Sequence, residues 1–184
     1  MTDLKKRFQD IIAPVIETVY ETEIIDGKGS WVTSRDGTQY LDFACGIATT
    51  NLGHRPDAVA AAAAAQLGKF WHAGGTFLYD SIVNAAEKIV SITPDGIDKV
   101  IFMNSGAEAV EASVKLARKV SGRQGIVTFR GGFHGRTMGS VTYTTSKAKY
   151  RQGYHPLLPS IFVTPFPHPY GWGMSQEEAN AYAL

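Results

Sequence analysis

The sequence is poor in cysteine, in charged residues and in long apolar runs. One cysteine in 184 residues excludes a disulfide framework within the chain and is compatible with a reducing compartment. Lys and Arg number 18 and Asp and Glu number 17, and this balance gives no general attraction to nucleic acid or to anionic membranes. No apolar run reaches the roughly 18 residues of a membrane span, and the N-terminus lacks the apolar core of a secretory signal. We therefore expect a soluble cytoplasmic protein that binds neither nucleic acid nor membrane.

Apolar residues and glycine, in contrast, are plentiful. Hydrophobic residues make up 44% of the chain, which is enough to build a core and argues against a disordered or coiled-coil protein. The 19 glycines gather in short stretches, and such stretches mark places where the backbone turns sharply or lies close to another group. These glycine clusters are the first indication of function.

The first half of the chain reads as helices around one hairpin. Asp36-Gly37 between two β-rich runs is typical of a hairpin turn, and Pro56 is well placed to open a helix. The predicted elements are a helix at residues 4–12, a hairpin of 31–34 with 38–43, and helices at 56–68 and 80–92.

The second half alternates strands and helices. The predicted strands are 99–103, 125–129, 141–144 and 160–164, and the predicted helices are 107–120 and 175–184. Strand, turn, helix and strand in this order indicate parallel pairing through a right-handed crossover, so the expected fold class is α/β.

The strongest local pattern is Asn104-Ser105-Gly106-Ala107-Glu108-Ala109, between a predicted strand and a predicted helix. Ser105 and Glu108 have the spacing of a capping box, which specifies the start of the helix. Gly106 lets another group approach the backbone, and the first amides of a helix have no partner within it. With the helix dipole they form a site for phosphate or carboxylate. A well-capped helix without a ligand explains the same residues, and the P-loop spacing is absent.

A second pattern, Gly131-Gly132-Phe133-His134-Gly135-Arg136-Thr137, follows a predicted strand. It is expected at the same carboxyl edge of the sheet as the first pattern, where open α/β sheets bind ligands. A planar ring can stack on Phe133, and Arg136 can bind a carboxylate with two hydrogen bonds. The alternative places Phe133 in the core and Arg136 in solvent.

A third glycine-containing stretch, residues 43–54, either lines a pocket or simply connects the hairpin to the next helix. We expect Cys45 to be a small buried residue and not a nucleophile, because no activating group lies near it in sequence. The five histidines show no metal-ligand spacing, so no metal site is expected, and no G-x-S-x-G elbow marks a serine hydrolase.

Taken together, these segments closely resemble the class III aminotransferases, from about residue 15 onward. The matching segments are Leu41-Asp42-Phe43 with Gly46-Ile47-Ala48, Asn51-Leu52-Gly53-His54, Asn104 to Ala109 with Lys115-Leu116-Ala117-Arg118, and Phe133-His134-Gly135-Arg136-Thr137. The family contains the 4-aminobutyrate, acetylornithine and ornithine transaminases. The resemblance implies a pyridoxal phosphate (PLP) enzyme of fold type I, here incomplete. Residues 1–55 would then be part of the small domain, and residues 56–184 the first part of the large domain with its mostly parallel sheet.

The resemblance also implies a cofactor site. Ser105, Gly106 and Ala107 match the turn that holds the cofactor phosphate. Phe133 matches the aromatic residue that stacks on the pyridine ring, and His134 matches its neighbour beside the cofactor.

For the substrate, Arg136 matches an arginine that binds the distal carboxylate, and Ile47 matches an apolar residue that lines the substrate side. The family's Schiff-base lysine lies far downstream of this arginine, beyond the last residue of this sequence. We therefore expect an inactive N-terminal fragment with no catalytic residue of its own.

The expected reaction moves an amino group from an ω-amine or amino acid to a 2-oxo acid such as 2-oxoglutarate, in a homodimer when the enzyme is full length. Two alternatives stay open at this point: a class III aminomutase or decarboxylase, and a non-catalytic fragment or binding module on the same scaffold.

Overall fold

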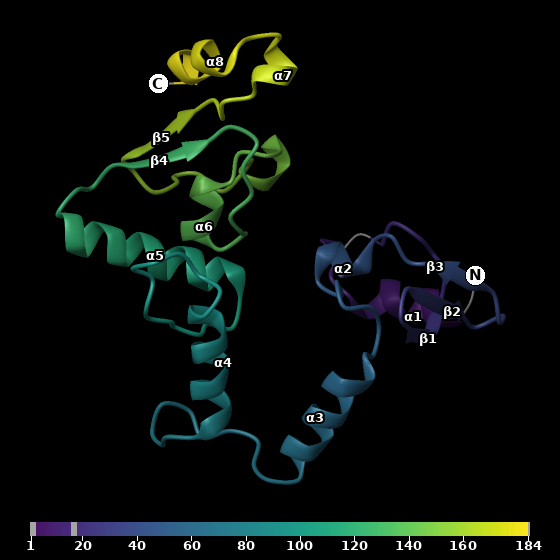
Figure 1. Ribbon diagram of the computed structural model, residues 1–184. Helices are drawn as coiled ribbons and strands as arrows, with labels where there is room; N and C mark the ends of the chain where they lie inside the picture. The colour runs from purple at the N-terminus through teal and green to yellow at the C-terminus, as the bar shows by residue number, and fades with distance from the viewer. Residues whose placement is uncertain (1–2, 16–17, 184) are drawn as a thin grey trace. The chain divides into compact units, whose positions relative to one another are not determined.

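The computed structural model describes residues 3–15 and 18–183, which divide into two units on either side of the Asp80–Ser81 bond. Figure 1 shows the elements of both units in chain order. The boundary expected near residue 55, between a small and a large domain, stays a prediction.

The first unit begins with α1 (Asp3–Ile11) and a three-stranded antiparallel sheet. The strands, in the order β1-β2-β3, are β1 (Ile24–Lys28), β2 (Trp31–Ser34) and β3 (Gln39–Leu41). The predicted hairpin is confirmed: the Asp36 carboxylate accepts hydrogen bonds from the Thr38 amide (3.0 Å) and the Ser34 hydroxyl (2.5 Å), and Gly37 supplies the positive φ. β1 was not predicted, because Asp26 and Gly27 interrupt its apolar run.

A left-handed turn follows the sheet. In α2 (Cys45–Ala48) all four residues have positive φ, between 47° and 61°. Such a conformation costs roughly 1–2 kcal/mol for each residue other than glycine, so this turn must be held by its surroundings. The expected burial of Cys45 is only partly correct, because this residue is half-buried and its thiol donates a hydrogen bond to the Asp42 carbonyl (3.2 Å).

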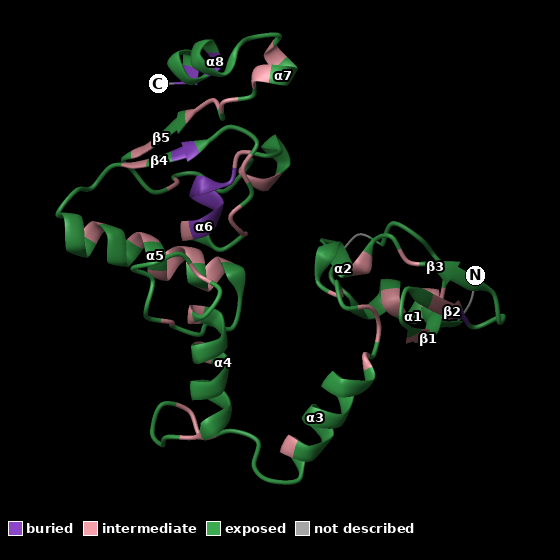
Figure 2. Cartoon of the chain, viewed as in Figure 1, coloured by how far each residue is buried: buried purple, intermediate pink, exposed green. Residues whose placement is uncertain are grey.

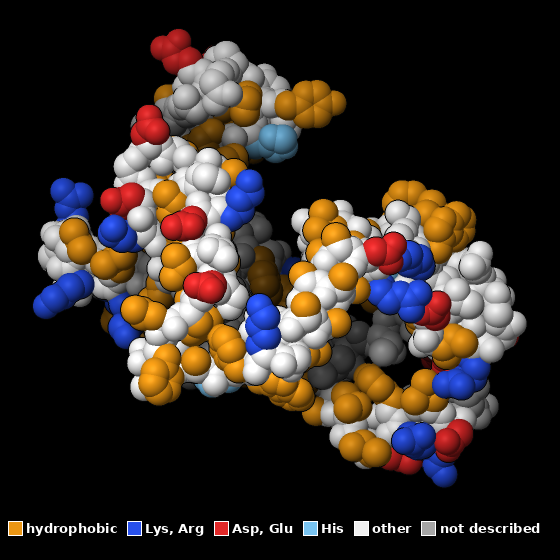
Figure 3. All heavy atoms as spheres, turned by 60° about the horizontal axis from the view of Figure 1, so that its bottom comes forward, with side chains coloured by type: hydrophobic (Ala, Val, Ile, Leu, Met, Phe, Trp, Pro, Cys, Tyr) orange, Lys and Arg blue, Asp and Glu red, His pale blue; other side chains and the backbone are white. Residues whose placement is uncertain are grey.

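Two predicted helices follow, α3 (Asp57–Leu67) and α4 (Asp80–Val90). Neither contains a buried residue, and Figure 2 shows both as largely exposed. Leu67 on α3 and Val83 on α4 are among their exposed apolar side chains, and Figure 3 shows that hydrophobic side chains are widespread on the molecular surface. Of the helices in the described ranges, none has the combined length and hydropathy needed to cross a membrane.

The second unit is built on one parallel strand pair. β4 (Ile126–Phe129) and β5 (Ile161–Thr164) pair in register from Ile126 with Ile161 to Phe129 with Thr164. This unit also contains α4 from Ser81 onward. Its other elements are α5 (Gly106–Ser121), α6 (Met138–Tyr143), η1 (Ala148–Tyr150), α7 (Pro169–Trp172) and α8 (Gln176–Ala183). β4 and β5 are parallel, but the predicted crossover from strand 99–103 through the helix to strand 125–129 is wrong, because residues 99–103 form no strand. The predicted helix 175–184 corresponds to α8, and its last residue lies outside the described residues.

Two predicted strands are wrong. Residues 99–103 form no strand, because no segment of the described chain pairs with them and Ile101 stays 75% exposed. Residues 141–144 belong to helix α6 and its C-cap instead. Thr137 and Ser140 form a capping box at the start of this helix, and the cap with burial overrides the strand preference of the β-branched residues.

The most buried part of the second unit surrounds α6, drawn purple in Figure 2. It is rich in hydroxyl groups: the buried residues here are Thr128, Ser140, Val141, Thr142, Tyr143 and Thr144. Because a buried hydroxyl must be hydrogen-bonded, these side chains fix the backbone around them, including the loop that enters α6.

Candidate cofactor and substrate site

The turn at residues 104–107 leads into α5. Ser105 is the N-cap, and its Oγ accepts a hydrogen bond from the Glu108 amide (3.2 Å). The Glu108 carboxylate accepts one from the amide of Asn104 (2.8 Å), one residue before its usual partner in a capping box. The Gly106 amide has no acceptor among the described residues, and a Cβ added to Gly106 would meet nothing within 4 Å. The turn therefore has room for an anion close to its backbone.

The loop between β4 and α6 is tied to the residues that follow α6. The Gly132 carbonyl accepts hydrogen bonds from the amides of Thr145 (2.8 Å) and Ser146 (3.0 Å), and its amide donates to Thr145 Oγ1 (3.1 Å). The His134 amide donates to Thr144 Oγ1 (2.9 Å). Phe133 therefore lies between two fixed peptide groups.

The turn and the loop meet at Gly135. This glycine has φ +122°, and a Cβ built on it would lie 2.7 Å from Cβ of Ala107 and 2.5 Å from Oγ of Ser140. Only glycine fits so close a contact. Nearby, the Thr137 hydroxyl donates to the Glu111 carboxylate and joins the start of α6 to α5. The two predicted motifs are thus brought together by direct packing, without the strand that was expected before the turn.

Phe133, His134 and Arg136 have different environments. Phe133 is 52% exposed, and its ring meets the Tyr150 ring edge-on, with centroids 5.4 Å apart, so Phe133 is not a core residue. His134 is half-buried, with Nε2 3.4 Å from Thr128 Oγ1. Arg136 is exposed, and its guanidinium has no ion-pair partner among the described residues. An exposed ring and an available guanidinium are suited to a planar, acidic ligand.

The remaining predicted site residue, Ile47, belongs to the first unit. It lies on the left-handed turn and is 93% exposed. Asp42 holds the turn: Oδ1 accepts hydrogen bonds from the amides of Ala44 (2.9 Å) and Cys45 (3.0 Å), and Oδ2 lies 2.7 Å from Nε2 of His54. The hydrogen bond with His54, followed by that from the Cys45 amide, lowers the pKa of Asp42 below its ordinary value.

The residues that hold the loop between β4 and α6 were not predicted from the sequence. Thr144 and Thr145 bond to its backbone, but they lie in a threonine-rich stretch that reads as a strand. The available signal was Thr137-x-x-Ser140, a spacing that marks the start of a helix.

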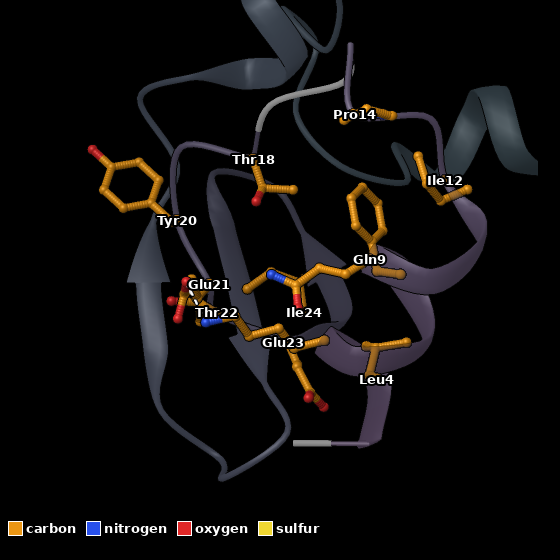
Figure 4. A pocket seen from close by; sticks show the side chains of 12 residues that line it. Leu4, Gln9, Ile12, Pro14, Thr18, Tyr20, Glu21, Thr22, Glu23 and Ile24 are labelled. Carbon is orange, nitrogen blue, oxygen red and sulfur yellow. Dashed lines mark ion pairs between the residues drawn. The ribbon is translucent and has the colours of Figure 1, made fainter. Parts of the chain in front are cut away.

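A cavity of about 640 Å³ lies in the first unit, between α1 and the segment that leads into β1 (Figure 4). Its walls are formed by Leu4, Lys5, Phe8, Gln9, Ile12, Pro14, Thr18, Tyr20, Glu21, Thr22, Glu23 and Ile24. Lys5 and Glu21 form an ion pair at this cavity (2.6 Å). None of the predicted site residues lines this cavity.

Comparison with known proteins places this geometry in a family. The model of the family described as "Aminotransferase class-III" matches residues 13–183. An acetylornithine aminotransferase of Listeria monocytogenes is 40% identical over 148 residues, which cover 80% of this chain. A probable 4-aminobutyrate aminotransferase of Bacillus subtilis is 40% identical over 157 residues, which cover 83% of it. A thermostable (S)-enantioselective ω-transaminase from Thermomicrobium roseum has the same fold over 97% of this chain and 43% of its own, with a TM-score of 0.85 at 25% identity.

The chain spans little more than a third of the curated relatives it matches, 37% of the Listeria protein and 36% of the Bacillus protein. Over that span the match includes both structural units. The resemblance seen in the sequence is therefore confirmed, together with the incomplete fold-type I architecture and the family's cofactor, PLP. The chain belongs to the class III aminotransferases.

Proposed function

We propose that this chain supplies the phosphate-binding turn and the ring-stacking loop of a PLP-dependent transaminase site. The contact of Gly135 with Ala107 is the observation that supports this proposal, because it joins the loop that carries the exposed Phe133 to the first turn of α5. The proposed reaction moves an amino group from an ω-amine or amino acid to a 2-oxo acid such as 2-oxoglutarate. When bound, PLP supplies an electron sink, and the protein supplies binding, orientation and electrostatics.

In this proposal the cofactor phosphate lies at the start of α5. The amides of Gly106 and Ala107 are the first of a 16-residue helix, so they have no acceptor within it, and the helix dipole adds to their attraction for an anion. Ser105 keeps the turn in shape through its bond with Glu108. The open space at Gly106 is the room that the phosphate needs.

Phe133 then provides a face for the pyridine ring, and His134 lies beside it. The half-exposed Phe133 ring supports the stacking role. The contact of His134 with Thr128 supports a role in shaping the loop next to the cofactor, and we assign His134 no proton transfer.

Arg136 is proposed to bind the distal carboxylate of an acidic substrate, and Ile47 to line the substrate side. The exposure of both residues supports these roles. No lysine of this sequence is assigned a covalent bond to PLP. We therefore propose that this chain binds PLP reversibly, and that turnover requires a longer polypeptide, acting as a homodimer.

Titration of the chain with PLP, followed by absorbance, tests the proposal with two matched pairs of variants. Gly106→Ala should weaken binding roughly tenfold, because the added Cβ enters the open space proposed for the phosphate and moves the phosphate away from amides whose hydrogen bonds to a charged group are worth about 1.5–3 kcal/mol. Gly75→Ala should have no effect, although Gly75 is equally open. Phe133→Leu should weaken binding by roughly 1 kcal/mol. Phe166→Leu should not, although Phe166 is also exposed and edge-paired.

Borohydride reduction and peptide mapping complete the test. We expect free-aldehyde absorbance that dialyses away, and no labelled peptide. A reduced, labelled lysine would show that this chain carries a covalent site after all. If Gly106→Ala and Gly75→Ala change PLP binding equally, the proposal that the phosphate binds at the start of α5 is wrong.

A further inference from the structure

A single buried hydroxyl holds the peptide group that follows Phe133. Thr144 is 0% exposed, and its Oγ1 accepts a hydrogen bond from the His134 amide (2.9 Å). The same hydroxyl lies 2.9 Å from the carbonyl oxygen of Gly135 and 3.2 Å from that of Ser140. A hydroxyl has one hydrogen and two lone pairs. The Thr144 hydroxyl can therefore donate its hydrogen to either carbonyl oxygen and still accept the hydrogen bond from the His134 amide.

The peptide group that precedes Phe133 is held separately. The Gly132 carbonyl accepts hydrogen bonds from the amides of Thr145 (2.8 Å) and Ser146 (3.0 Å). Peptide groups are planar, so fixing the groups on both sides of one Cα restricts the φ and ψ of that residue. The backbone of Phe133 is therefore held on both sides, and the direction in which its side chain leaves the backbone is set.

The Phe133 ring itself remains accessible. The residue is 52% exposed, and its ring meets the Tyr150 ring edge-on. When a planar ligand stacks on this ring, the backbone that carries the ring is already fixed. Binding therefore costs less conformational entropy of the protein than binding to a loop that must first be ordered.

We propose that Thr144 is a positioning residue for the cofactor ring. Its hydroxyl fixes the peptide group between Phe133 and His134, and so aims the Phe133 ring at the pyridine ring of PLP. This inference rests on the function proposed above and adds a residue to it that does not touch the cofactor.

Thr142, which lies in α6 two residues before Thr144, offers a matched control. It is 1% exposed, and its Oγ1 donates to the Met138 carbonyl (2.9 Å) and accepts from the Leu158 amide (3.3 Å). Thr→Val at either position removes a buried hydroxyl and leaves a backbone amide without its acceptor, so the two losses of stability should be similar. Only the change at Thr144 removes a bond to the loop.

The experiment compares Thr144→Val, Thr144→Ser and Thr142→Val in the 184-residue chain. Thr144→Val should raise the exchange rate of the His134 amide hydrogen about tenfold or more, because that amide loses its acceptor. It should raise the dissociation constant for PLP about threefold to tenfold, the size of one lost aromatic stacking contact. Thr144→Ser keeps the hydroxyl and should restore both quantities, and Thr142→Val should change neither.

Phe133→Leu separates this inference from the proposed function. If Phe133→Leu weakens PLP binding, Thr144→Val should add nothing further in that background, because the two residues act as one unit. If Phe133→Leu weakens binding and Thr144→Val behaves like Thr142→Val, the proposed function stands and the role of Thr144 is overturned. If Phe133→Leu has no effect, or if the chain does not bind PLP, the stacking role fails and the inference fails with it.

A measurement without a destabilising variant covers the case in which Thr144→Val does not fold. In the wild-type chain the His134 amide should exchange more slowly than the Phe133 amide, which has no acceptor among the described residues. Thr144→Ser should preserve that difference. Equal exchange rates at the two amides in the wild-type chain would overturn the inference.

Discussion

Nε2 of His54 lies 2.7 Å from Oδ2 of Asp42, while Oδ1 of the same carboxylate accepts hydrogen bonds from the amides of Ala44 and Cys45. Asp42 follows β3, and His54 stands shortly before α3. The carboxylate thus ties together both ends of the segment that contains the left-handed turn. Four consecutive residues with positive φ persist there because this pair and the backbone bonds around it fix the ends.

This pair predicts a pH dependence. The pKa of Asp42 is lowered chiefly by the hydrogen bond with His54 and then by that from the Cys45 amide. A carboxylate whose pKa falls on folding stabilises the fold above its unfolded pKa, about 3.9. That contribution is lost as the pH falls through the lower, folded pKa. We expect the carboxyl carbon resonance of Asp42 to titrate below the ordinary range, and His54→Phe to raise its midpoint.

Asp36 is the control for this titration. Its pKa is also lowered, chiefly by the hydrogen bond with the Ser34 hydroxyl and then by that from the Thr38 amide, and neither donor depends on His54. The midpoint of Asp36 should stay in place in His54→Phe. An equal upward movement of both midpoints would indicate general loosening and would contradict a specific pair.

Replacing Ile47 with glycine should stabilise the chain. Ile47 has φ 60° and is 93% exposed, so the change relieves strain and loses little packing. The gain of roughly 1–2 kcal/mol, less the cost of about 0.5–1 kcal/mol for a flexible glycine, leaves a net gain that denaturant unfolding can detect. Ile24→Gly, at a paired strand position that is not among those with positive φ, should instead destabilise. A loss of stability in both variants would show that the turn is not strained.

Gly135→Ala should be strongly destabilising. It combines a positive φ with overpacking against Ala107 and Ser140, which together cost about 2–5 kcal/mol. Gly131→Ala is the matched change, because Gly131 also has positive φ, 85°, but a Cβ there meets nothing within 4 Å. Its cost should be about 1–2 kcal/mol. Urea unfolding of both variants measures the difference, and equal costs would contradict the contact between turn and loop.

Arg136→Ala should change substrate preference in an active enzyme that contains this chain. Loss of a two-point hydrogen bond to a carboxylate should lower kcat/KM for dicarboxylic substrates about 10- to 100-fold. Substrates with an amine and no distal carboxylate should be affected much less. Arg130→Ala serves as the control for loss of a nearby positive charge. If kcat/KM falls equally for both substrate classes, Arg136 does not recognise the distal carboxylate.

Local structure was predictable where a few neighbouring residues specify it. Ser105 and Gly122 bound α5, with a side-chain cap at one end and a left-handed C-cap at the other, and the sequence places this helix within one residue at each end. The Asp36-Gly37 hairpin was predictable for the same reason. Strands were less predictable, because a strand forms only when it pairs with another strand. Residues 99–103 have the composition of a strand but have no partner among the described residues.

At the site, the sequence indicates which residues to examine but not how they meet. Ser105 to Ala107 and Phe133 to Arg136 follow from local motifs and from the family resemblance. Their contact through Gly135 depends on the packing of α5 against the loop and α6. The role of Thr144 was hidden because its bond to His134 spans ten residues and its β-branched neighbours favour a strand.

The bonds that fasten the loop have a kinetic consequence. They join residues close in the chain: Gly135 and Thr144 are nine positions apart, and Phe129 and Thr145 are sixteen positions apart. The pairing of β4 with β5, which begins with Ile126 and Ile161, joins segments that are farther apart in the chain. Short loops close with less loss of entropy and favour rapid folding. During synthesis, the ring-bearing loop would accordingly take shape before the parallel strand pair closes.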